Sequence, residues 1–179
     1  MQDCMVWMDL EMTGLNPETA VIVEIATIVT DKDANVVAEG PVIAIAHPPE
    51  TIAAMDSWSR EHHESAGLMA RILASEIDTA EAEKRTLAFV SSLAEKRAAP
   101  LCGNSIWQDR RFLVKYMPEL NEYLHYRMVD VSTIEELARR WYPRLPKYEK
   151  KGAHTALSDI RESIAELKYY REKLFVSPD

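Results

Sequence analysis

The sequence predicts an α/β fold in which helices flank a mixed β-sheet, within one domain over residues 1–179. Three predicted strands come first, the second of them rich in β-branched residues, and short turns join them, which is typical of an antiparallel meander. Helical patterns then alternate with short apolar runs. The composition, 47% apolar and 28% charged, is ordinary for a globular domain that is large enough to bury a core.

The first half of the chain contains three predicted strands followed by helices. The strands are predicted at residues 5–8, 21–30 and 36–45. A polar turn over residues 31–35 joins the last two. From residue 47 we expect short helical pieces, with Ser57 as an N-cap. A longer helix is predicted from residue 78 or 79 to about residue 96, because apolar residues recur on one side.

Strands and helices alternate in the second half. Short strands are predicted at residues 100–102 and 126–131, and helices at about 109–117 and 155–174. Pro118 is expected to stop the first of these helices. Ser132 or Thr133 is expected to cap a further helix that runs to about residue 141. Residues 143–152 carry several Lys and Pro residues and are predicted to be a mobile basic loop.

The charge and the cysteines restrict the possible partners and compartments. A formal charge of −8 argues against a protein that coats long nucleic acid, since such binding needs many Lys and Arg contacts to phosphates. It allows a very short nucleic acid that is held by metals and a few cations. Cys4 and Cys102 are unclustered and indicate a reduced, cytoplasmic protein. Neither a signal-peptide pattern nor a membrane-spanning run is evident.

Asp9 and Glu11 follow the first apolar run directly. Side chains alternate along a strand, so both acids are expected on one face together with Trp7. Two neighbouring carboxylates on an interior strand repel each other and resist burial, and a divalent cation would relieve both effects. The alternative is an exposed strand end whose acids face water.

Asp109, His154 and Asp159 are three further candidates. Asp109 follows a loop after a buried strand, where an acid also commonly stabilises a helix dipole. His154 and Asp159 stand five residues apart and can face one cleft if His154 belongs to the loop before the last helix. The alternatives are a solvent-facing histidine and a surface Asp159 paired with Arg161 or Lys150.

Taken together, Asp9, Glu11, Asp109, Asp159 and His154 match the needs of two-metal phosphodiester hydrolysis. The four carboxylates would hold two divalent cations. Ligation by oxygen alone favours Mg²⁺ or Mn²⁺ over Zn²⁺. His154 suits the general base, because its ordinary pKa lies near neutrality.

Three segments resemble the exonuclease motifs of the DEDDh 3′-to-5′ exonucleases. They are Asp9-x-Glu11-x-Thr13-Gly14-Leu15, Gly103-Asn104-Ser105-Ile106-x-Gln108-Asp109 and His154-x-Ala156-x-x-Asp159. The whole chain is similar to the oligoribonuclease family within that superfamily. Further matching segments lie at residues 110–113, 116–120, 125–127, 130–133 and 159–163. Trp107 departs from the family pattern, where this position is small, and could alter the packing near Asp109.

The resemblance implies a ribonuclease H-like fold and removal of nucleotides from the 3′ end of very short RNA, especially linear dinucleotides. It implies that the four carboxylates hold two Mg²⁺ or Mn²⁺ ions and that His154 is the catalytic base. Two rival functions remain open. One is a related nuclease that trims structured RNA or DNA, and the other is a binding module for nucleotides or RNA ends that has lost catalysis.

The resemblance also implies contacts with the substrate bases. Leu15 would wedge between the two bases, and Trp58 would stack on one of them. Without the family, Trp58 reads equally well as an ordinary core or helix-packing residue.

The remaining implied residues surround the 5′ phosphate or come from a second protomer. Ser105, Arg127, Ser132 and Thr133 would form a cap on the substrate's 5′ phosphate. Without the family, Arg127 reads as a solvated strand residue, and Ser132 and Thr133 as helix caps. The family forms homodimers, in which His125 and Tyr126 would reach the partner's site. Their alternative is simple strand packing.

Overall fold

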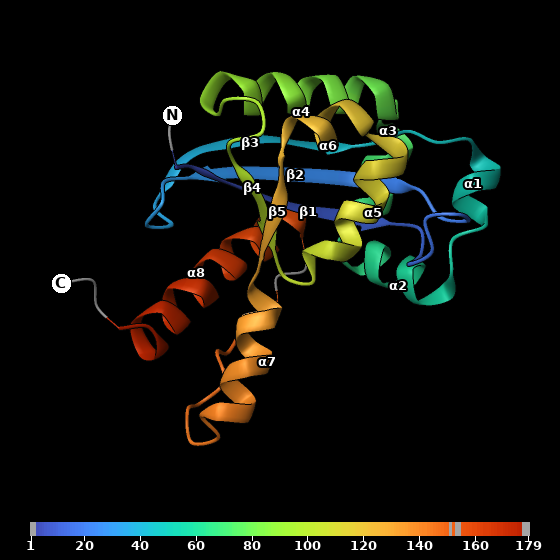
Figure 1. The fold of residues 1–179 in the computed structure, drawn as a ribbon. Coiled ribbons are helices and arrows are strands. Elements are labelled where there is room, and N and C mark those ends of the chain that lie inside the picture. Colours follow the sequence, from blue (N-terminus) through green and yellow to red (C-terminus); the bar gives the residue numbers. More distant parts are fainter. Residues whose placement is uncertain (1–2, 151, 153–154, 177–179) are drawn as a thin grey trace.

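In the computed structural model, which describes residues 3–150, 152 and 155–176, five strands form one mixed sheet. The strands are β1 (Met5–Met12), β2 (Ile22–Thr30), β3 (Val36–Ala44), β4 (Pro100–Gly103) and β5 (His125–Asp130). Their order in the sheet is β3-β2-β1-β4-β5 (Figure 1). The first three are antiparallel, and β4 and β5 run parallel to β1. The predicted mixed sheet, flanked by helices in a single domain, is confirmed.

Two layers of helices cover the sheet. One layer holds α4 (Thr79–Leu93), α5 (Ile106–Tyr116) and α6 (Pro118–Tyr123), and the other holds α7 (Val131–Trp141) and α8 (Ala156–Leu174) (Figure 1). Two short helices, α1 (Pro49–Ala53) and α3 (Leu68–Ala74), pack around Val23 of β2 in a third apolar cluster, and α2 (Ser57–Ser65) packs against α3. Among the described residues, no helix has the length and apolar character needed to cross a membrane.

Strand β1 lies in the middle of the sheet and separates the two main cores. Val6, Met8 and Leu10 pack into the core under α4, α5 and α6, whereas Trp7 packs into the core under α7 and α8. The indole N–H of Trp7 donates to Thr30 Oγ1 at 2.9 Å, which satisfies its one polar group in the interior. The alternation predicted from the sequence is therefore present, and β1 is buried on both faces.

Helix α5 begins at Ile106, three residues earlier than predicted. Ser105 is the N-cap residue and adopts a left-handed backbone with φ of 49°, so the helix starts directly at the end of the loop. Ile106 is buried in the core, which anchors this first turn. Pro118 does end α5, but it also begins α6, because proline is tolerated at the first position of a helix.

Two predicted caps were wrong by one to three residues. Asp56 caps α2 in place of Ser57 and accepts a hydrogen bond from the backbone N–H of Ser59 at 2.9 Å. Asp130 caps α7 in place of Ser132 or Thr133. A carboxylate at these positions accepts the free N–H groups and favours the positive end of the helix dipole.

Other boundaries differ slightly from the predictions. Strand β5 ends at Asp130 because that residue becomes the cap, and α4 ends at Leu93 rather than near residue 96. Residues 143–150 and 152 contain neither helix nor strand, as expected for the predicted loop.

Candidate active site

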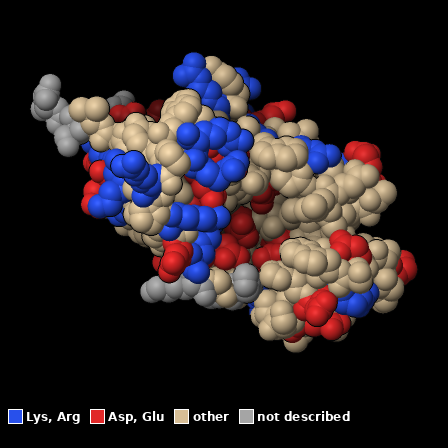
Figure 2. All heavy atoms as spheres, turned by 90° about the horizontal axis from the view of Figure 1, so that it is seen from below, with Lys and Arg blue, Asp and Glu red and all other residues tan. Residues whose placement is uncertain are grey.

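Asp9, Glu11 and Asp159 form a cluster of carboxylates where β1 meets α8. Each offers one oxygen, and the three oxygens lie within 4.8 Å of one another. β1 presents Asp9 and Glu11 on the same face as Trp7, and Asp159 lies in the first turn of α8. Oxygen ligands at this spacing suit a hard divalent cation such as Mg²⁺ or Mn²⁺. On the face viewed from below, Asp and Glu atoms gather in a hollow (Figure 2).

A capping box fixes the start of α8 and therefore the position of Asp159. Thr155 Oγ1 accepts from the backbone N–H of Ser158 at 3.4 Å, and Ser158 Oγ accepts from the backbone N–H of Thr155 at 3.2 Å. His154, the predicted base, directly precedes this cap in the sequence but lies outside the described residues.

Asp109 comes to the cluster from α5. It is buried, and its Oδ1 accepts a hydrogen bond from the backbone N–H of Leu10 at 2.9 Å. Asp109 is not one of the three residues whose oxygens lie within 4.8 Å of one another. Its charge nevertheless acts on the cluster: after burial, the charge of Asp109 is the largest cause that raises the pKa of Asp9 well above its ordinary value.

The other carboxyls of the site also resist ionisation. Burial, followed by the charge of Glu24, raises the pKa of Glu11 to about 8. Burial raises the pKa of Asp109 to about 7. Carboxylates in one buried site cannot all be charged at neutral pH without a compensating cation. The residues present therefore fit a divalent metal in both donor type and electrostatics.

Glu24 is a further buried acid at the site that sequence reasoning missed. It lies opposite Glu11 in the β1–β2 register and forms an ion pair with Arg71 of α3. Burial raises the pKa of Glu24, whereas Arg71 and then the backbone N–H of Ala156, at the start of α8, lower it. Glu24 thus lies among β2, α3 and the start of α8. The available signal was one acidic residue inside an otherwise apolar strand.

His63 is a second residue that the sequence did not single out. Its Nε2 lies 2.8 Å from the carbonyl oxygen of Met12, and its Nδ1 lies 3.6 Å from Glu11 Oε2. Burial lowers the pKa of His63. Because a carbonyl only accepts, the proton of the neutral ring is on Nε2, and the Nδ1 lone pair faces the acidic cluster.

The two residues predicted to contact bases are both exposed. Leu15 is 72% exposed, and its carbonyl oxygen accepts a hydrogen bond from Gln108 of α5. Trp58 is 69% exposed on α2 and stacks on His62 with ring centroids 5.1 Å apart. Trp58 is therefore not a core residue. The backbone N–H of Asp56 donates to Thr13, which ties the start of α2 to the end of β1.

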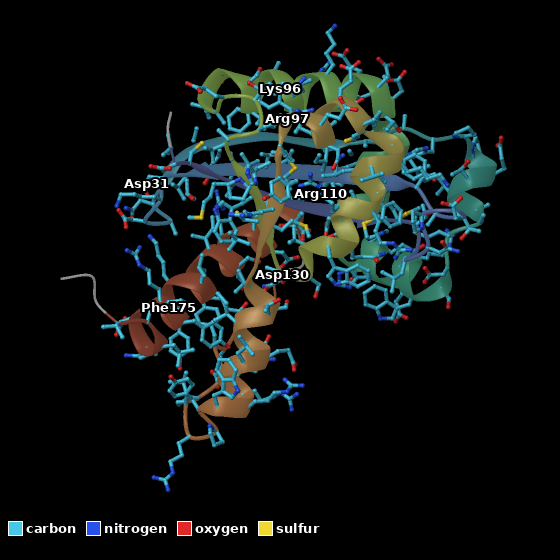
Figure 3. All side chains as sticks on the ribbon, in the orientation of Figure 1. Asp31, Lys96, Arg97, Arg110, Asp130 and Phe175 are labelled. Carbon is cyan, nitrogen blue, oxygen red and sulfur yellow. The ribbon has the colours of Figure 1, made fainter. Side chains whose placement is uncertain are left out.

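Ser105 and Ser132, two of the predicted phosphate-binding residues, lie side by side. Their hydroxyl oxygens are 3.3 Å apart, and Asp130 Oδ1 accepts hydrogen bonds from both backbone N–H groups at 3.0 Å. Asp130 stands at the junction of β5 and α7 (Figure 3). Thr133 is exposed on the first turn of α7, and Arg127 is exposed on β5.

The two residues predicted to act across a dimer follow each other on β5. The rings of His125 and Tyr126 are 4.5 Å apart, and the guanidinium of Arg127 lies 5.4 Å from the Tyr126 ring centroid. Tyr126 is 73% exposed, so its side chain packs only partly within this chain. Trp107 is also exposed, with Arg111 over its ring. Its indole therefore does not pack into the buried surroundings of Asp109.

Comparisons with known proteins identify close relatives. Residues 6–167 match the family described as Exonuclease. The chain is 58% identical to an oligoribonuclease of Aliivibrio fischeri over 172 residues, which are 96% of this chain and 95% of the relative. It is 55% identical to an oligoribonuclease of Pseudomonas syringae pv. tomato, with 97% of each chain covered.

Solved structures of more distant proteins share the fold. A crystal structure of E. coli exonuclease I in complex with an oligonucleotide matches with a TM-score of 0.72 at 17% identity. The match covers 95% of this chain but only 41% of that one. Exonuclease I of Methylocaldum szegediense matches with a TM-score of 0.64 and 18% identity, and 41% of it is covered. The chain therefore belongs to the exonuclease family and, within it, to the oligoribonucleases.

Proposed function

We propose that this protein is a metal-dependent 3′-to-5′ exoribonuclease that degrades short single-stranded RNA, and especially linear dinucleotides, to nucleoside 5′-monophosphates. The observation that carries the proposal is the meeting of Asp9, Glu11 and Asp159, whose oxygens lie within 4.8 Å, in a member of the oligoribonuclease family. The relatives that share more than half of the sequence supply the substrate class.

In this proposal Asp9, Glu11, Asp109 and Asp159 would hold two Mg²⁺ or Mn²⁺ ions. When bound, the two cations lower the pKa of the attacking water and stabilise charge on the leaving oxygen. The raised pKa values of the carboxyls mean that they release protons as they become ligands. His154 would accept the proton of the attacking water.

The remaining predicted residues would hold the substrate. Leu15 would separate the two bases, and Trp58 would stack on one of them, a contact worth ~1–3 kcal/mol. Ser105, Ser132 and Thr133 would cap the 5′ phosphate together with Arg127, whose guanidinium can donate twice to one phosphate. A third nucleotide would occupy the space of this cap, which gives a physical reason for a preference for dinucleotides.

The enzyme is proposed to act as a cytoplasmic homodimer. Tyr126 is exposed although it is a large aromatic residue, which supports an interface role for this part of β5. His125 and Tyr126 of each protomer would complete the site of its partner. Sedimentation at several concentrations tests the dimer, and a Tyr126→Ala protein that stayed dimeric with full activity would contradict the role of this residue.

Cleavage rates on single-stranded RNA of two to ten nucleotides test the substrate class. We expect the 5′-phosphorylated dinucleotide to be cleaved fastest, with Mn²⁺ or Mg²⁺ present. Faster cleavage of the longer species would instead indicate a nuclease that trims longer RNA or DNA. A purified protein that bound the dinucleotide with Mn²⁺ but left it uncut would be a binding module.

A further inference from the structure

Glu166 of α8 is a fully buried carboxylate outside the proposed catalytic set. It is 0% exposed, and its Oε2 accepts a hydrogen bond from Asn104 Nδ2 at 2.9 Å. The same oxygen lies 3.0 Å from Lys150 Nζ. A buried carboxylate is costly unless it is paired and hydrogen-bonded. Both partners of Glu166 belong to segments next to the site, since Asn104 precedes Ser105 and Lys150 precedes the start of α8.

Asn104 connects Glu166 to the proposed phosphate cap. Its Nδ2 donates both to Glu166 and to Ser163 Oγ, the latter at 3.0 Å. Its Oδ1 accepts a hydrogen bond from Ser132 Oγ at 3.3 Å. The Asn104 nitrogen donates two hydrogen bonds and its oxygen accepts one, and this pattern fixes the orientation of the amide. With its amide nitrogen held by α8, Asn104 presents its oxygen to Ser132.

Ser105 and Ser132 depend on this arrangement. Ser132 Oγ accepts a hydrogen bond from the backbone N–H of Ser105 at 3.0 Å. Ser105 has a left-handed backbone, which is unfavourable for a residue other than glycine and persists only when its surroundings hold it. A fixed Ser132 hydroxyl therefore helps to hold Ser105 in the conformation that places both hydroxyls 3.3 Å apart.

We propose that Glu166 is a positioning residue for recognition of the substrate's 5′ phosphate: it holds Asn104, which orders Ser132 and Ser105 before the phosphate arrives. The inference rests on the proposed function. Preordering a binding site improves affinity because less freedom is lost on binding. Lys150 pairs with the same Glu166 oxygen that accepts from Asn104, and so helps to hold the carboxylate in place.

Binding of two ligands to three variants tests the inference. The ligands are an RNA dinucleotide with and without a 5′ phosphate, titrated with Ca²⁺ present and with intactness of the RNA checked in each sample. Glu166→Leu removes the acceptor, Glu166→Gln keeps an acceptor oxygen, and Glu172→Gln is a control on the exposed part of α8. The readout is the ratio of the two dissociation constants, which a general loss of structure would not change selectively.

We expect Glu166→Leu to reduce the preference for the phosphorylated ligand about fivefold, the ratio that corresponds to ~1 kcal/mol for one hydrogen bond. Glu166→Gln should keep most of the preference, and Glu172→Gln all of it. The inference would be overturned if Glu166→Leu preferred the phosphorylated dinucleotide as strongly as the unaltered protein does. It would also be overturned if Glu166→Leu bound both dinucleotides more weakly by the same factor. An unaltered protein that bound neither ligand would refute the proposed function itself, and the inference with it.

Lys150→Met provides a second test without a substitution in the interior. It leaves the charge of Glu166 uncompensated, so we expect the phosphate preference to fall in the same direction. Lys147→Met is the matched control, because Lys147 comes from the same segment and pairs with Glu135 of α7 instead. If Lys150→Met and Lys147→Met had the same preference as the unaltered protein while Glu166→Leu failed to fold, the inference would be wrong.

Discussion

Asp9 is a buried carboxylic acid with four other acids around it. The charges of Asp109, Glu11, Asp159 and Glu24 all raise its pKa, after burial itself. A side chain in such surroundings opposes folding unless a cation or a proton neutralises it. Ligation of a divalent cation, as in the proposed metal site, would remove this cost.

Asp9→Asn tests this explanation with a change of almost equal size. We expect turnover to fall by more than about a hundredfold. Loss of a group that only hydrogen-bonds to a metal ligand lowers activity about 10–100-fold, and loss of the ligand itself should have a larger effect. The metal-free variant should unfold at the same or a higher temperature than the unaltered protein, since a repelled charge is gone. Rates and calorimetry measure both effects, with Glu64→Gln on the exposed side of α2 as the control. Activity close to that of the unaltered protein would refute the ligand role.

The stability of the metal-free protein should fall as the pH rises from about 4.5 to 8. The folded-state pKa values of Glu11 and Asp109 are raised to about 8 and about 7, above their ordinary values of 4.5 and 3.8. Across this window the folded state binds more protons than the unfolded state, so the free energy of unfolding decreases with pH. Mn²⁺ should restore more stability at pH 8 than at pH 5.

Thermal melts with EDTA or with Mn²⁺ at several pH values measure this dependence. Glu11→Gln should show a shallower slope without metal, because one of the shifted groups is absent. A melting temperature of the metal-free protein that rose steadily through the same window would show that these carboxyls are not shifted as described.

Single residues also show what the sequence could and could not predict. Asp9, Glu11, Asp109 and Asp159 could be singled out as candidates, the first two from strand periodicity and all four from their motifs. Glu24 and His63 were missed because their roles depend on partners far away, Arg71 for the first and Met12 for the second. An acid inside an apolar strand is visible in the sequence, but the cation that pairs with it is not.

At the level of elements, the start of α8 sets the position of Asp159. Thr155→Ala removes the side-chain cap and should cost ~1 kcal/mol of unfolding free energy. Turnover should fall as well, because Asp159 is in the first helical turn. Thr155→Ser keeps the hydroxyl and serves as the control. Urea denaturation and kcat are the measurements, and identical values for the Ala and Ser variants would contradict the role of the cap.

The errors in the predicted elements concern their ends. Asp130 and Ser132 can both cap a helix, and local sequence does not decide between them. In the fold, Ser132 Oγ is engaged with Ser105 and Asn104, which leaves Asp130 to accept from the start of α7. Helix α5 likewise starts at Ile106 because Ile106 is buried in the core, a tertiary effect that periodicity does not contain.

For the whole molecule, a formal charge of −8 surrounds a site that binds an anionic substrate. We expect a weak dependence of dinucleotide affinity on salt, with a slope of log K against log salt no steeper than about −2, since each neutralised phosphate of a single strand contributes about −0.7. Titrations between low and physiological salt measure the slope. A much steeper slope would indicate a basic track for longer RNA.

The mixed sheet and its flanking helices could be predicted because strands and helices have different periodicities. The strand order and the meeting of β1, α5 and α8 could not be derived from local pattern, since they depend on contacts between residues about a hundred positions apart, such as Leu10 and Asp109. Only the resemblance to a family supplied that information in advance.

The hydrogen bond from the Leu10 N–H to Asp109 also provides a spectroscopic probe of the site. β4 pairs with β1 only as far as Trp7, whereas β2 continues beside Leu10 on the other edge of β1. Asp109 accepts the hydrogen bond of the Leu10 N–H in place of a strand partner. The proton on that amide touches the carboxylate that is proposed to bind metal. The NMR chemical shift of this proton should therefore change when Mg²⁺ is added. An unchanged Leu10 amide signal at a saturating Mg²⁺ concentration would indicate that Asp109 is not a metal ligand.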